Sequence, residues 1–299
     1  MNIAISGASG LIGRRLLKVL AKDGHALTVL SRHAGTNLPP GVQLSVWDPL
    51  KGEPSAGALR EARAVIHLAG APVAQRWNDK ARREIRESRV AGTRNLVEGL
   101  SKLAGKPEVL LCASAIGYYG SRGDEVLTES AAPGSDYLAE VCVAWEKEAQ
   151  AAEALGIRVV RVRTGIVLDA RGGALPRMLP PFKMGVGGRL GNGRHWMSWI
   201  HLDDLASLYQ FALANPLSGA VNGVAPNPVT NADFTRALAA AVHRPAIFPV
   251  PALALRLMFG EMAEILMASQ IVAPKVAEAA GFSFRFPQLA AALADVLKS

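Results

Sequence analysis

Three evenly spaced glycines near the start of the chain have the clearest chemical meaning. They stand in SGASGLIG, directly after the apolar run NIAIS and at the start of a helical pattern. The first permits a tight turn, the second lets the backbone approach a pyrophosphate, and the third lets a helix pack closely on a sheet. Free N–H groups at the helix start then bind the phosphates. The residues of this predicted dinucleotide site are Gly7, Ala8, Ser9, Gly10, Leu11, Ile12 and Gly13.

The end of the next predicted strand, 26–31, indicates which dinucleotide binds. A site for NAD has Asp or Glu about 20 residues beyond the loop, where it binds the ribose 2′-hydroxyl. This chain has Ser31 and Arg32 there instead. Because a guanidinium can pair with a 2′-phosphate and a hydroxyl can add a hydrogen bond, we predict NADP(H). Asp48 is either an acceptor for the adenine amino group or an ordinary turn residue before Pro49.

Predicted strands and helices alternate along the first half of the chain, and they would position these residues. The predicted strands are 2–6, 26–31, 43–47, 64–69, 108–114 and 157–163, and the helices include 11–22, 79–104 and 137–154. Such alternation is typical of βαβ units whose parallel sheet is buried on both faces. The expected fold class is therefore α/β, a Rossmann-type doubly wound parallel sheet.

The character of the sequence changes after Thr164. Residues 165–193 are rich in glycine and proline, which predicts a long functional loop. A strand-like run at 196–201 and helices at 202–214, 231–242 and 252–270 follow. We expect a dinucleotide-binding domain over 1–164, with sheet contributions from about 196–225, and a smaller, mostly helical substrate region over 165–299.

Composition excludes several classes of protein. With 50% apolar and 19% charged residues the chain is not wholly disordered, and two cysteines are too few for a disulfide framework or a Cys-based zinc site. The absence of a spanning apolar run and of a signal peptide predicts a cytoplasmic protein without membrane contact. The net charge of +8 would suit nucleic acid or an anionic small molecule, but there is no basic arm. We therefore expect a small-molecule substrate, no nucleic acid and no metal.

Longer motifs resemble a known superfamily. GASGLIG, VIHLAGAP, VAGTRNL and SAIGYYG are similar to segments of the extended short-chain dehydrogenases/reductases, which include sugar-nucleotide epimerases and dehydratases. WEKEA, RTGIVL, SWIHLDDL and NGVAPNPVTN resemble its epimerase-like subfamily, which ends in a small C-terminal domain of unknown function. The resemblance covers essentially the whole chain and allows a monomer or a homodimer. It implies a nicotinamide site lined by Leu68, Ala69, Gly70, Ala113, Ser114, Ile166 and Val167.

The resemblance also implies a set of three catalytic residues, of which this chain lacks one. In the superfamily a Ser or Thr, a Tyr, and a Lys four residues after the Tyr carry hydride chemistry. Ser114 and Tyr137 match the first two, but Val141 stands at the lysine position. A free phenol has a pKa near 10, and a nearby ammonium would favour the phenolate. Lys147 is ten residues beyond Tyr137, about 15 Å along a helix, and cannot substitute.

Arg89 belongs to the apolar stripe of the predicted helix 79–104, because steps of three and four place it with Ile85, Gly92 and Leu96. The superfamily often has an asparagine here, beside the active site. Arg89 either contacts an anion or carbonyl near the cofactor or extends into solvent. We expect Arg163, Arg194, His195, Trp199 and His201 near the substrate side, where the run RHWMSWIH would suit a polar or anionic ligand. His201 is more readily a buried, hydrogen-bonded histidine.

Two functions fit these residues. One is an NADP(H)-dependent oxidoreductase or epimerase-like enzyme that acts on a small polar substrate, nucleotide-linked substrates included. The alternative is a non-catalytic NADPH-binding or sensing protein, which Val141 favours.

Overall fold

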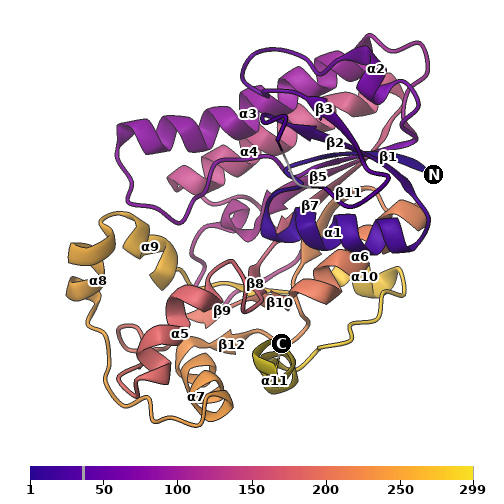
Figure 1. Ribbon diagram of the computed structural model, residues 1–299. Helices are drawn as coiled ribbons and strands as arrows, with labels where there is room; N and C mark the ends of the chain where they lie inside the picture. Colours follow the sequence, from indigo (N-terminus) through magenta and orange to yellow (C-terminus); the bar gives the residue numbers. More distant parts are fainter. Residues whose placement is uncertain (36–37, 299) are drawn as a thin grey trace.

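A seven-stranded parallel sheet forms the centre of the computed structural model, which describes residues 1–35 and 38–298. The strand order is β11-β7-β5-β4-β1-β2-β3 (Figure 1). The bounds are β1 (Asn2–Ser6), β2 (Ala26–Ser31), β3 (Gln43–Val46), β4 (Ala64–His67), β5 (Val109–Ala115), β7 (Arg158–Thr164) and β11 (Gly219–Gly223). The order reverses between β1 and β4, and ligands of doubly wound sheets bind outside the carboxyl ends of the strands at such a point.

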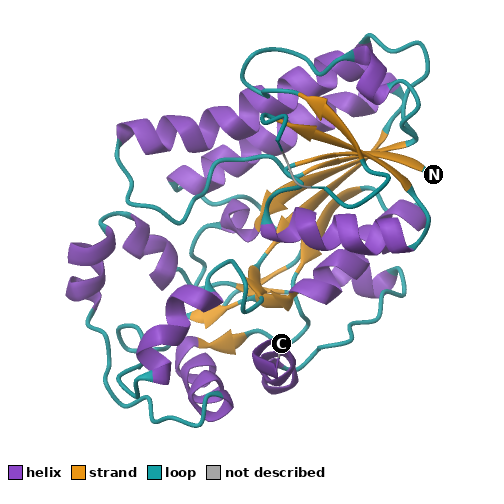
Figure 2. Ribbon diagram, viewed as in Figure 1, coloured by secondary structure: helices purple, strands orange, loops and turns teal. Residues whose placement is uncertain are grey.

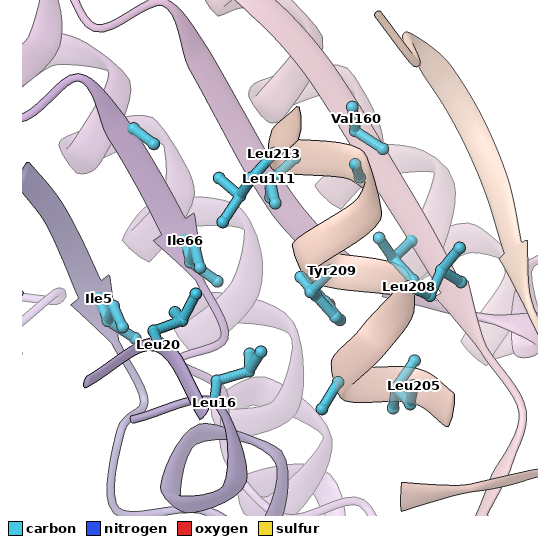
Figure 3. Packing of buried hydrophobic residues seen from close by; sticks show 14 of the residues in the cluster. Ile5, Leu16, Leu20, Ile66, Leu111, Val160, Leu205, Leu208, Tyr209 and Leu213 are labelled. Atoms are coloured by element: carbon cyan, nitrogen blue, oxygen red, sulfur yellow. The ribbon is translucent and has the colours of Figure 1, made fainter. Parts of the chain in front are cut away.

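Helices cover both faces of this sheet (Figures 1 and 2). On one face, α1 (Leu11–Lys22) and α6 (Leu202–Ala214) bury leucines against Ile5, Ile66 and Leu111 (Figure 3). On the other, α3 (Asp79–Ser101) and α4 (Tyr137–Gln150) pack Leu96 and Trp145 over Leu110. The strands are apolar nearly throughout because both of their faces are buried. The predicted fold class is confirmed.

The C-terminal part has its own core, in which Leu179, Trp199, Phe234 and Leu293 are buried together. Its main helices are α5 (Leu175–Lys183), α7 (Asn231–Ala241), α8 (Ala252–Phe259), α9 (Met262–Met267) and α11 (Leu289–Lys298). Two short strand pairs lie within this part: β8 (Ile166–Leu168) with β10 (Trp199–His201), and β9 (Trp196–Met197) with β12 (Val229–Thr230). A third pair, β6 (Val126–Leu127) with β13 (Ile271–Val272), joins it to the rest of the molecule. The remaining short helices are α2 (Ala56–Leu59), η1 (Ile116–Tyr119), η2 (Ala151–Leu155) and α10 (Lys275–Ala279).

Two predicted elements differ from the observed ones. The expected loop 165–193 contains α5 despite its prolines, because Leu175, Leu179 and Phe182 bury one face of the helix. The single helix expected over 252–270 is interrupted at Gly260, whose φ of +61° ends α8 before α9 begins. Within the described ranges, no helix combines the length and apolar character needed to cross a membrane.

Candidate functional site

The glycine loop joins β1 to α1 in a conformation that excludes side chains. Gly7 has a φ of +71°, and a Cβ there would lie 2.6 Å from the Leu68 carbonyl carbon. A Cβ on Gly13 would lie 2.4 Å from the Gly7 carbonyl oxygen. Gly10 is the N-cap of α1, and no side chain caps the helix there. The loop therefore leaves helix-start N–H groups free for an anionic ligand, with Ala8, Ser9, Leu11 and Ile12 between the glycines.

A buried hydrogen bond fixes the ends of β1 and β4 beside this loop. The Ser6 hydroxyl and the His67 Nδ1 are 2.6 Å apart, and the Leu68 N–H donates to the Ser6 hydroxyl at 3.3 Å. Burial lowers the pKa of His67 to about 4, so its imidazole is neutral at pH 7. Leu68, Ala69 and Gly70 follow directly, and Leu68 and Ala69 pass next to Gly7.

Two arginines lie on the outer side of the loop. β2 pairs with β1 so that Leu30 is opposite Ser6, and Ser31 and the exposed Arg32 follow at the same edge of the sheet. The Arg14 guanidinium donates to the Ser9 carbonyl oxygen of the loop itself. Arg14 is not among the predicted cofactor residues, although its position directly after Gly13 places it in the first turn of α1.

Asp48 has the geometry of a turn residue. Its Oδ1 accepts from the Leu50 N–H at 3.1 Å, and its Oδ2 lies 3.5 Å from the Lys51 Nζ. The turn interpretation is therefore observed, and the contact with adenine stays a prediction.

Ser114 belongs to a buried polar network between β5, α4 and β7. Its hydroxyl donates to the Glu146 Oε1 at 2.7 Å. Arg163 binds the same carboxylate through Nε at 2.8 Å and Nη2 at 2.9 Å, and its Nη1 donates to the Tyr119 hydroxyl at 3.0 Å. Tyr119 in turn donates to the Asn222 Oδ1 at 2.6 Å. Arg163, expected near the substrate side, is buried, and its guanidinium is hydrogen-bonded within the protein.

Tyr137 opens α4 and faces α3. Its hydroxyl donates to the Arg82 carbonyl oxygen at 2.5 Å, and its ring meets the Trp77 ring edge to face at a centroid distance of 5.4 Å. Burial raises the pKa of the Tyr137 phenol, and the charges of Arg82, Arg86 and Arg89 oppose that rise. Val141 is buried in the core. Guanidinium groups of α3 thus provide the positive charge near this phenol.

The hydroxyls of Ser114 and Tyr137 bind different partners in this structure. Glu146, which accepts from Ser114, is nine residues after Tyr137, or about 14 Å along the axis of α4. Tyr137 bonds instead to α3. The two predicted catalytic side chains therefore lie on one helix–strand unit without forming a hydrogen-bonded pair.

Arg89 turns inward, so the interpretation of a side chain in solvent is wrong. Its Nη1 donates to the carbonyl oxygens of Ala71 at 3.0 Å and Ile85 at 3.1 Å. The guanidinium carbon lies 5.1 Å from the Trp145 ring centroid, and a Cβ on Gly70 would be 3.2 Å from it. Burial lowers the pKa of Arg89. In the described part of the chain, no carboxylate pairs with this cation.

The remaining predicted residues divide into edge and core positions. Ala113 in β5 and Ile166 and Val167 in β8 are partly buried. Trp199 is fully buried and donates to the Asn227 carbonyl oxygen, so it belongs to the core and not to a ligand site. His201 is buried and accepts the Asp203 N–H at the start of α6, which confirms the interpretation as a hydrogen-bonded structural histidine.

Family models match two parts of this chain. Residues 3–225 match the NAD dependent epimerase/dehydratase family, and residues 250–296 match a domain of unknown function. The chain belongs to the NAD dependent epimerase/dehydratase family. The family resemblance inferred from the motifs is confirmed.

Relatives of this epimerase-family protein cover the whole chain. An epimerase family protein of Mycobacterium tuberculosis is 42% identical over 97% of this chain and 96% of its own length. The chloroplastic SDR39U1 homolog of Arabidopsis thaliana is 39% identical over 100% of this chain and 87% of its own. The crystal structure of human SDR39U1 with NADPH covers 100% of both chains at 32% identity, with a TM-score of 0.89. UDP-glucuronic acid 4-epimerase of Bacillus cereus, at 16% identity and a TM-score of 0.81, shares the fold.

Proposed function

We propose that the protein binds NADP(H) in the glycine loop. The observation that carries this proposal is the cradle at Gly7 and Gly13, where a Cβ would collide with backbone, beside the uncapped start of α1. The human relative, which was solved with NADPH, supports it. In this proposal the loop binds the diphosphate, Ser31 and Arg32 bind the 2′-phosphate with help from Arg14, and Asp48 contacts adenine.

The nicotinamide end is assigned to the carboxyl ends of β4, β5 and β8. Residues proposed to line it are Leu68, Ala69, Gly70, Arg89, Ala113, Ile166 and Val167. The bound cofactor would supply or accept a hydride. Arg89 suits this place because its hydrogen bonds to described residues go to neutral carbonyl oxygens, so the buried guanidinium can stabilise a nearby anion or polarised oxygen.

We further propose that the protein is an oxidoreductase or epimerase-like enzyme for a small polar substrate, nucleotide-linked substrates included. Tyr137 would carry the proton, since it lies beside three guanidinium groups at the partly exposed start of α4. Ser114 would serve as a hydrogen-bond acceptor only, because its own proton lies in the bond to Glu146. Activity measurements on Ser114→Ala and Tyr137→Phe test the two proposed roles.

A non-catalytic NADPH sensor is the second candidate. Two observations favour it: Val141 is buried where the superfamily has lysine, and both candidate hydroxyls donate to acceptors within the protein. A screen of small polar substrates that follows NADPH oxidation separates the two functions. Activity that depends on Tyr137 and is lost in Tyr137→Phe supports the enzyme; NADPH binding without turnover of any substrate supports the sensor.

The cofactor assignment is tested by fluorescence titration with NADPH and NADH. Arg32→Ala should weaken NADPH binding about tenfold or more and NADH binding little, because a charge-assisted contact contributes about 1.5–3 kcal/mol. Arg60→Ala, at the exposed end of α2 before β4, is the matched control. An unchanged preference in Arg32→Ala would show that this guanidinium does not recognise the 2′-phosphate.

A further inference from the structure

Side chains from three segments meet at the amino end of α3. The Arg82 guanidinium carbon lies 4.9 Å from the Tyr137 ring centroid and 5.9 Å from that of Trp77. Arg82 also forms an ion pair of 2.5 Å with Glu261, which stands between α8 and α9. Figure 1 shows α8 and α9 close to this end of α3. The cluster therefore joins the sheet part of the molecule to its C-terminal part.

Positive charge is in excess around this cluster. Arg82, Arg86 and Arg89 follow one another at steps of four and three, so they lie on one side of α3. Among the described residues, these three arginines form one ion pair, between Arg82 and Glu261. The Arg82 Nε is buried and has no hydrogen-bond partner, and Arg89 bonds to neutral carbonyl oxygens. Guanidinium forks with unused donors are suited to carboxylates and phosphates.

We propose that this cluster binds an anionic group of the substrate, a carboxylate or a phosphate, and that Glu261 occupies Arg82 until the substrate displaces it. The inference rests on the proposed function, because it places the substrate next to Tyr137. The Arg82 and Glu261 side chains are 38% and 55% exposed. An ion pair with this exposure contributes little to stability, so a ligand anion can replace it easily. Glu261 thus competes with the substrate anion for Arg82.

The test uses the full-length protein without cofactor, titrated at constant ionic strength. The probes are inorganic phosphate, glucuronate, and glucose as the neutral counterpart of glucuronate. Tryptophan fluorescence reports binding, since Trp77 lies in the cluster, and a Trp77→Phe variant identifies its contribution. We expect saturable binding of phosphate or glucuronate and none of glucose; which of the two anions binds more tightly tells whether the substrate group is a phosphate or a carboxylate.

Two substitutions should act in opposite directions. Arg82→Gln should weaken anion binding about tenfold or more, and Glu261→Gln should tighten it several-fold because the competitor loses its charge. Arg83→Gln removes the same charge as Arg82→Gln from an exposed neighbouring position and should change the affinity less than twofold. A merely structural role of the ion pair would not make Glu261→Gln bind more tightly.

Several outcomes would overturn the inference. Equal losses in Arg82→Gln and Arg83→Gln would show a general charge effect, and unchanged or weaker binding in Glu261→Gln would show that Glu261 does not compete. If neither anion binds, the cluster is not an anion site. NADPH is absent from these titrations, so the anion site and the cofactor site are tested separately. If the protein binds NADPH and no anion, the cofactor proposal stands and this inference fails. If the protein binds the anions and not NADPH, only the cofactor proposal fails.

Discussion

The Ser114 hydroxyl donates a 2.7 Å hydrogen bond to the Glu146 carboxylate, which Arg163 also binds through two donors. Alternation along β5 places Ser114 on the same face as Leu110 and Cys112, under α4. The bond therefore ties the end of β5 to α4 and, through Arg163, to β7. This contact gives Ser114 a structural role that can be measured apart from catalysis.

Loss of this network should lower stability in steps. Ser114→Ala should reduce the free energy of unfolding by about 1–3 kcal/mol, because a buried carboxylate loses a donor. Arg163→Met should reduce it by about 3–5 kcal/mol, because the Glu146 charge would remain buried without a partner. Urea unfolding followed by circular dichroism measures both. Ser218→Ala, at an exposed position, should stay within about 0.5 kcal/mol of the wild type; equal stability of Ser114→Ala would contradict the assigned role.

The glycine loop should not tolerate a methyl group at Gly13. In Gly13→Ala the new Cβ would meet the Gly7 carbonyl oxygen at 2.4 Å, so the loop must shift. We expect a loss of about 1–3 kcal/mol in stability and a loss of NADPH binding. Gly105→Ala is the control, since a Cβ there has nothing within 4 Å. NADPH binding by Gly13→Ala with wild-type affinity would rule out this loop as the diphosphate site.

Acidification should destabilise the protein through His67. Burial lowers the pKa of His67 from 6.5 to about 4. Between these values the unfolded chain binds a proton that the folded protein does not, so the free energy of unfolding falls as the pH falls from 6.5 towards 4. The full effect of this group is about 3 kcal/mol.

Urea unfolding at pH 7.5 and pH 4.5 checks the role of His67. The difference between the two pH values should be smaller in His67→Gln than in the wild type. His243→Asn, which removes an exposed histidine, should leave most of the difference in place. An identical pH dependence in His67→Gln and the wild type would mean that other groups cause the acid sensitivity.

Arg14 should contribute to the recognition of NADPH. Its guanidinium already lies against the Ser9 carbonyl oxygen of the glycine loop. Arg14→Gln should weaken NADPH binding several-fold and leave NADH binding nearly unchanged, because the lost charge would face the 2′-phosphate. Fluorescence titration with both dinucleotides measures this. Equal losses for the two would instead indicate that Arg14 supports the loop backbone.

Local sequence patterns alone determined the α/β fold, the bounds of β1, α1, β2 and α6, and the place of the glycine loop. Each depends on residues within a few positions of one another: a buried apolar run, a helical stripe, or glycines where a side chain would collide. The predicted cofactor, which depends on Arg32, agrees with the NADPH in the human relative.

Only the tertiary structure decided which polar groups meet. Ser114 bonds to Glu146, Tyr137 to the Arg82 backbone, and Arg82 to Glu261, pairs separated by 32, 55 and 179 residues. Such partners depend on how β5, α3, α4 and the α8–α9 turn pack together. A polar side chain that packing removes from water must bind the nearest complementary group, and no spacing along the chain specifies which group that is.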